Sequence, residues 1–135
     1  AGNSVFVIAE KSPFFIVGGG QVPDNGWLTI HGKKTPIKSV RYIKKAIAAE
    51  IDAPVDLTVG DEVISTVHEQ KRIDAMKNHT ATHLLRAALM QLFGNQIKQS
   101  GSLVHPDYLR FDFTYHGTLS DADIKQVEDL VNEKI

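Results

Sequence analysis

The spacing of apolar positions along the chain changes near His68. Before that point, apolar residues come in short runs separated by glycine, proline, asparagine and aspartate; the runs cover residues 4–9, 14–17, 27–30 and 63–67. Short apolar runs bounded by turn-forming residues predict β-strands. We therefore expect residues 1–68 to form a β-rich subdomain that resembles a small barrel or sandwich.

After His68 the apolar positions follow mostly helical spacing. Residues 72–93 predict a long helix, with Asn78 as a candidate N-cap and Gly94 as its C-terminal stop. Alternation over residues 109–114 predicts a strand with one buried face. Ser120, followed by acidic residues, predicts the capped start of a second helix. The expected fold class is thus α+β, with a central helix against an antiparallel sheet in residues 69–135.

Composition narrows the choice of protein class. The chain is 42% hydrophobic, which is ordinary for a globular protein, and no apolar run approaches the ~18 residues of a membrane span. It has no cysteine, which excludes disulfides and any complete cysteine-containing metal site within this chain and fits a cytoplasmic protein. The net charge of -1 gives no overall attraction for nucleic acid. Any RNA contact must come from a local patch, such as the basic run at 33–45, which a solvated surface explains equally well.

Two histidines indicate a possible metal or substrate site. His79 and His83 are one helical turn apart, so both imidazoles lie on one face and can reach one metal ion or one small substrate. The spacing alone also fits a chance pair or two core histidines. A zinc protease is disfavoured, because Thr80 stands where the H-E-x-x-H signature requires a glutamate.

The residues around this pair resemble the editing domain of alanyl-tRNA synthetase over almost the whole chain. The similarity is carried by Asn78-His79-Thr80-Ala81-Thr82-His83-Leu84-Leu85, then Gln99-x-Gly101-Ser102-Leu103-Val104 and Leu109-Arg110-Phe111-Asp112-Phe113. Upstream, Gly-Gly-Gly-Gln-Val-x-Asp-x-Gly at 18–26 matches the glycine-rich element of the same family. Free-standing editing proteins that act on mischarged alanine tRNA share these elements.

The resemblance implies a ligase that charges tRNA(Ala) with alanine and an editing region that hydrolyses wrongly attached serine or glycine. It implies zinc held by His79, His83 and a later Cys-x-x-x-His that this chain lacks. We therefore expect zinc to be absent or weakly held here, and the isolated fragment to be inactive. ATP and Mg belong to an aminoacylation domain outside this chain. The expected partner is tRNA(Ala), with neither DNA nor a membrane.

The resemblance also assigns residues to the editing pocket. Thr82 and Gln99 are the expected catalytic residues, and Gly19, Gly20 and Gln21 are expected to contact substrate. A plainer interpretation has the Thr82 hydroxyl bonded to its own helix backbone and Gln99 at the surface. The glycine run is no phosphate loop, since it lacks Gly-Lys-Ser/Thr.

Two arginines stand next to the motifs. Arg72 and Arg110 are candidate substrate contacts, and internal salt bridges are an equal alternative for both.

Other assignments stay open at this point. The chain begins with Ala1-Gly2 rather than Met and stops at Ile135 inside a helical pattern, so we expect a piece of a longer ligase. A free-standing trans-editing deacylase and a non-catalytic tRNA-binding module are the alternatives. A Cys-x-x-x-His beyond Ile135 would favour either enzyme, and a natural stop codon would favour the binding module.

Overall fold

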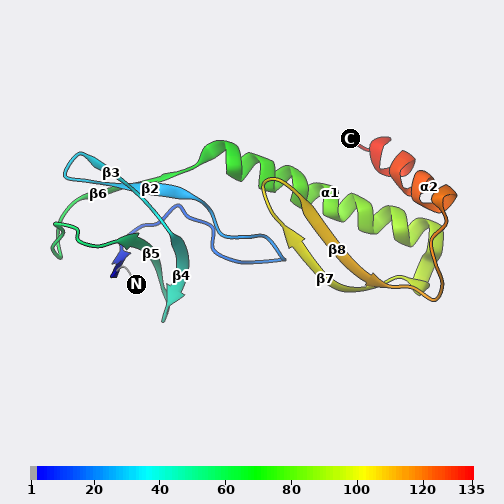
Figure 1. Cartoon of the computed structure of the whole chain (residues 1–135), viewed down its shortest axis with the longest axis horizontal. Coiled ribbons are helices and arrows are strands. Elements are labelled where there is room, and N and C mark those ends of the chain that lie inside the picture. Colours follow the sequence, from blue (N-terminus) through cyan, green and yellow to red (C-terminus); the bar gives the residue numbers. More distant parts are fainter. Residues whose placement is uncertain (1–2) are drawn as a thin grey trace. The chain divides into compact units, whose positions relative to one another are not determined.

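The structure is a computed structural model that describes residues 3–135. Within these residues, two α-helices, one short 3-10 helix (Gly94–Gln96) and eight strands follow one another along the chain, and Figure 1 shows their arrangement. They are β1 (Ser4–Ile8), β2 (Gly26–Ile30), β3 (Lys33–Pro36), β4 (Ser39–Ile43), β5 (Ala46–Asp52), β6 (Val63–Val67), α1 (Glu69–Phe93), β7 (Lys98–Val104), β8 (Leu109–Thr114) and α2 (Asp121–Asn132). The α+β class expected from the sequence is confirmed. No helix of the described part is long and apolar enough to cross a membrane.

Contacts divide the chain into two compact units. The first contains the residues up to Gly18 together with Val22–Ile73, and the second contains Gly19–Gln21 together with Asp74–Ile135. The short segment Gly19–Gln21 therefore belongs with residues that lie far away in the sequence.

The first unit holds two antiparallel sheets, ordered β1–β5–β4 and β3–β2–β6. Within the described residues no strand pairing joins the two sheets, so they do not close into a barrel. Their apolar faces share one core, in which Leu28 and Ile51 are almost completely buried. The predicted β-rich first half is therefore present as a pair of small sheets.

Residues 14–17, predicted as a strand, form none. Phe14 is buried in the core of the first unit, so the apolar run reflects burial of a loop. The loop is held by Asp24, whose carboxylate accepts a hydrogen bond from the Phe15 backbone N–H (2.6 Å). The Asp24 N–H in turn donates to the Phe15 carbonyl (3.0 Å). A side chain thus satisfies the backbone donor that a strand neighbour would otherwise have bonded.

In the second unit, α1 packs against the β7–β8 hairpin and α2 (Figure 1). The shared core consists of Ala88, Leu89, Ile97 and Val127, flanked by Phe111 and Phe113 of β8. This arrangement matches the expected helix against an antiparallel sheet. The bounds of β8 are the residues that the alternating pattern predicted.

The predicted caps had mixed outcomes. The N-cap assignment of Asn78 is wrong, because α1 begins at Glu69 and Asn78 lies well inside it. Its side-chain amide donates instead to the carbonyls of His105 and Pro106, at 2.7 and 3.0 Å. Gly94 follows the last residue of α1 with a φ of 60°, as expected of a helix stop. Ser120 caps α2 in a reciprocal capping box with Asp123, and these hydrogen bonds lower the pKa of the Asp123 carboxyl.

The Gly19–Gln21 segment lies alongside β7. The Val104 N–H donates to the Gly20 carbonyl (2.8 Å), and Gln21 forms a parallel bridge with Val104. Gly20 has a φ of 83°, and a Cβ at this position would lie 2.7 Å from the Ser102 carbonyl oxygen. Only glycine fits both the backbone angle and the close approach.

Candidate active site

His79 and His83 present their rings on one side of α1. The two ring planes are nearly parallel, at an angle of 11° with centroids 5.3 Å apart. His79 is half-buried, whereas His83 is exposed. The rings therefore face the same space, as their spacing predicted.

That space is a cavity of about 210 Å³ within the second unit. It is lined by Gly19, His79, Thr82, His83, Arg86, Gln99, Ser102 and Phe111. The structure thus brings the histidine pair together with Thr82 and Gln99, the two expected catalytic residues. Of the three residues of the glycine segment that were expected to contact substrate, Gly19 also lines the cavity. Gly20 and Gln21 are not among the lining residues. What each residue does in the cavity stays a prediction.

An irregularity in β7 positions Gln99. In a regular strand, residues three apart face opposite sides. Ser100 pairs with no residue of β8, so Gln99 lies opposite Phe113 while Ser102 lies opposite Phe111. The two phenylalanines are two apart in β8 and their rings stack at 5.9 Å, which puts all four side chains on one face. The bulge therefore directs both polar side chains toward the cavity.

Thr82 fits both interpretations made from the sequence, a pocket residue and a hydroxyl bonded to its own helix backbone. It donates to the Asn78 carbonyl one turn earlier (2.8 Å), and Thr82 also lines the cavity. Because the hydroxyl proton is engaged, the oxygen can only accept a hydrogen bond from a ligand. Thr82 therefore fits a ligand that brings a donor.

Gln21 contacts His79 but is not among the residues that line the cavity. Its side-chain oxygen lies 2.7 Å from Nδ1 of His79. Gln21 is only 7% exposed, and it is one of two buried polar residues in the described part. The local sequence gives no sign of this contact, because the two residues are 58 positions apart.

The two arginines named from the sequence lie elsewhere. Arg72, in the first unit, forms a two-pronged ion pair with Asp24 and donates to the Pro13 carbonyl (2.7 Å). Hydrogen bonding to Asp24 raises the pKa of Arg72. Arg110 pairs with Asp112 (Nε to Oδ1, 3.0 Å), on the face of β8 opposite Phe111. Neither arginine lines the cavity, and both make the salt bridges that were the alternative.

Arg86 is a lining residue that the sequence reasoning missed. It follows His79 by two helical turns and His83 by nearly one, so it extends the same stripe of α1. It makes no ion pair within residues 3–135, and the cavity lining contains no carboxylate. The helical spacing from His79 was the available signal.

The described residues do not complete a zinc site. No group of three or more histidine, cysteine, aspartate or glutamate side chains within residues 3–135 could hold a metal ion. A structural or catalytic zinc takes three or four protein ligands, so the two imidazoles supply only part of a set.

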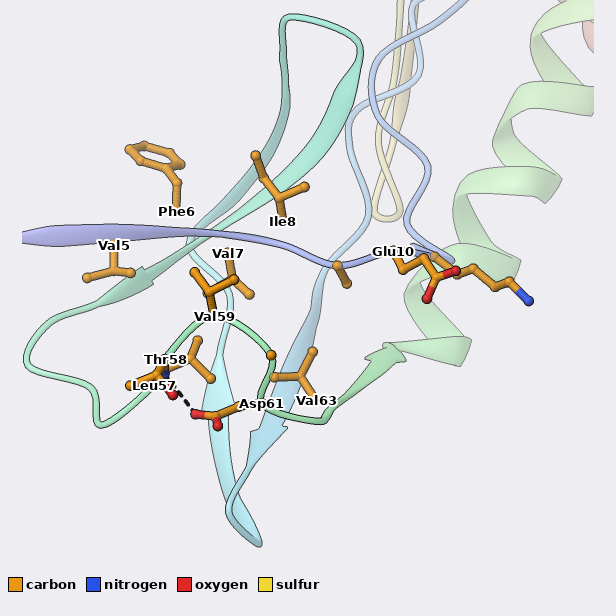
Figure 2. Close-up of a pocket in the computed structure, with 13 residues that line it drawn as sticks. Val5, Phe6, Val7, Ile8, Glu10, Leu57, Thr58, Val59, Asp61 and Val63 are labelled. Atoms are coloured by element: carbon orange, nitrogen blue, oxygen red, sulfur yellow. Dashed lines mark hydrogen bonds between the residues drawn. The ribbon is translucent and has the colours of Figure 1, made fainter.

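A larger groove lies in the first unit but offers less chemistry (Figure 2). It measures about 700 Å³ and runs along β1 and residues 57–63, with mostly aliphatic side chains. Its Asp61 carboxylate accepts a hydrogen bond from the Thr58 backbone N–H (2.7 Å), which lowers the pKa of Asp61. His31 lies 3.4 Å from the Asp61 carboxylate but is not among the lining residues. Within the described part of the chain the groove is thus lined by no histidine pair, and we place the candidate site at the smaller cavity.

Comparison with known proteins identifies relatives along the whole chain. No protein-family model matches it. The alanine–tRNA ligase of Thermotoga maritima is 43% identical over 135 residues, which make up 98% of this chain and 16% of that protein. Those of Acetivibrio thermocellus and Thermus thermophilus are each 42% identical over 137 residues and 99% of this chain. This chain is homologous to one segment of alanine–tRNA ligases. It spans 15–16% of the length of these alanine–tRNA ligases.

Proposed function

We propose that this chain is part of the editing region of an alanine–tRNA ligase, and that its cavity binds the 3′ aminoacyl ester of tRNA(Ala) mischarged with serine or glycine. The observation that carries the proposal is one cavity shared by the two parallel imidazoles, the Thr82 hydroxyl and the Gln99 amide. The homology to alanine–tRNA ligases supports tRNA(Ala) as the partner and the cytoplasm as the location. Alanine charging, with ATP and Mg, would take place outside this segment.

The size of the cavity suits a small group. At about 210 Å³ it is smaller than the roughly 300–1,000 Å³ of sites that enclose drug-sized ligands. It can hold an aminoacyl group, while the nucleotide that carries this group stays outside. Serine and glycine are both small enough to enter.

Hydrogen bonding favours serine over alanine. The Thr82 oxygen accepts but does not donate toward the cavity, since its proton is bonded to the Asn78 carbonyl. A serine hydroxyl can donate to this oxygen, whereas the alanine methyl group cannot. A hydrogen bond of this kind contributes about 0.5–1.5 kcal/mol, which separates the two esters by about two- to tenfold.

Hydrolysis requires a water and a group that takes its proton. A neutral imidazole is the common general base at physiological pH, and both His79 and His83 line the cavity. The Gln99 amide can orient the ester or the water through one donor and one acceptor. Zinc, when its remaining ligands are supplied from outside this chain, would polarise the water or the carbonyl.

Among the described residues that line the cavity, Arg86 is the one arginine or lysine. A phosphodiester accompanies every aminoacylated 3′ end, and an arginine with no internal partner can bind it without reading sequence. We assign Arg86 to this phosphate contact.

The test is hydrolysis of Ser-tRNA(Ala) by the complete ligase that carries this segment. Replacing Thr82 by valine should slow deacylation by about two- to tenfold and leave alanine charging unchanged. Thr80→Val is the matched control, because Thr80 also donates to a carbonyl one turn earlier (Met76, 3.2 Å) but is exposed and does not line the cavity. Equal rates for the two variants would remove Thr82 from the site.

A further inference from the structure

We infer that Gln21 is a positioning residue that holds His79 in the tautomer with its proton on Nδ1. The side-chain oxygen of Gln21 lies 2.7 Å from that nitrogen. An amide oxygen only accepts hydrogen bonds, so Nδ1 must be the donor. A neutral imidazole carries one ring proton, and Nε2 is therefore left with its lone pair free.

The free nitrogen lies at the edge of the cavity. A Cβ added at Gly19 would lie 3.5 Å from Nε2 and 3.4 Å from Cε1 of His79. Gly19 and His79 both line the cavity, whereas Gln21 does not. The ring thus turns its bonded nitrogen toward the buried amide and its free nitrogen toward the residues of the lining.

The Gln21 amide has little freedom to leave this position. The residue is 7% exposed, and its backbone bridges to Val104, which is completely buried. The neighbouring Gly20 carbonyl accepts the Val104 N–H at 2.8 Å. Because the strand contact fixes the backbone, ordering the amide beside His79 costs little further entropy.

The second histidine lacks such a partner. His83 is exposed and makes no hydrogen bond to another residue of the described part. Its ring lies parallel to that of His79, and both histidines line the same cavity. His83 thus lacks the Nδ1 acceptor of His79 and is also more exposed, and it serves as an internal reference for a histidine without that acceptor.

This inference concerns the resting state of His79 and does not depend on the hydrolase assignment. Whether Nε2 accepts a proton from water or binds a metal, it must present a lone pair. The Gly19–Gln21 segment then has two tasks in the second unit. Its glycines allow the close approach to α1 and β7, and its glutamine sets the proton of the first histidine.

The test is ¹⁵N NMR of the histidine side chains in this chain, with no added ligand or metal, near pH 8, where ordinary imidazoles are neutral. We expect His79 to show a protonated Nδ1 and an unprotonated Nε2. Gln21→Met keeps the side-chain length but removes the acceptor, and it should change the tautomer ratio of His79 by about two- to tenfold. The His83 signals should not move.

Gln99→Met is the matched control, since it makes the same substitution at a glutamine that lines the cavity. It should leave the His79 tautomer as in the parent chain. A His79 that carries its proton on Nε2 in the parent chain would overturn the inference, as would an unchanged His79 in Gln21→Met. If Gln21→Met does not fold, the parent spectrum alone decides.

Discussion

Replacing Arg72 tests whether this residue holds the fold or contacts the substrate. Its guanidinium bonds both carboxylate oxygens of Asp24 and also donates to the Pro13 carbonyl. The Asp24 side chain is 4% exposed and the Arg72 side chain 32%. Among the described residues, Arg72→Met would therefore leave the buried Asp24 carboxylate with the Phe15 N–H as its remaining hydrogen-bond donor.

The size of the loss follows from these contacts. Removing one partner of a buried ion pair costs about 3–5 kcal/mol, and removing one of an exposed pair costs less than about 1 kcal/mol. Because the arginine is one-third exposed, we expect Arg72→Met to lower the free energy of unfolding by about 2–3 kcal/mol. Arg72→Lys keeps the charge but not the two-pronged geometry, so it should lose less.

Urea unfolding followed by tryptophan fluorescence measures the loss of unfolding free energy in the first structural unit, where the ion pair lies. The chain has one tryptophan, Trp27 in β2, which belongs to the same unit as the ion pair. The midpoint should fall in Arg72→Met while the slope stays the same. A loss below about 0.5 kcal/mol, with weaker tRNA binding by the complete ligase, would refute the structural role and restore Arg72 as a substrate contact.

Three further predictions concern the second unit. Asn78→Ala removes the two hydrogen bonds to the turn between β7 and β8 and should cost about 1–2 kcal/mol in thermal or urea unfolding; a loss near zero would contradict it. Gly20→Ala places a Cβ against Ser102 at a positive φ and should lower the free energy of unfolding by about 2–4 kcal/mol. Hydrogen exchange should then show lost protection at the Val104 N–H, which is bonded to the Gly20 carbonyl, and retained protection would contradict this prediction. The lowered pKa of Asp123 means that its capping contribution is present above 3.8 and is lost as pH falls through the folded-state value. Carboxyl ¹³C NMR should therefore find it titrating below 3.8, and a value at or above 3.8 would exclude the capping box in solution.

The local sequence pattern was sufficient to predict helices and strands that bury one side. The alternation in residues 109–114 matched β8 residue by residue, and Ser120 marked the start of α2. In both cases the signal lies within a few neighbouring residues. The homology to alanine–tRNA ligases was also visible from the motifs.

Contacts between distant residues could not be predicted in this way. The apolar run at 14–17 resembles a strand, but a carboxylate nine positions away bonds its backbone. Asn78 is of a residue type that often caps helices, but it lies inside the helix that the apolar spacing predicted from residue 72. The bulge at Ser100 and the Gln21–His79 contact depend on pairing that no local spacing encodes. The proposed boundary between residues 68 and 69 and the roles of the cavity residues stay predictions.

The most direct test of the proposed site is NMR titration of this chain with a non-hydrolysable 3′-seryl-amide analogue of adenosine, with the 3′-alanyl analogue beside it. We expect shifts at His79, His83, Thr82 and Gln99, and tighter binding of the seryl compound by about two- to tenfold. Shifts confined to the first unit, or equal binding of the two compounds with no change at the histidine pair, would contradict the proposed site.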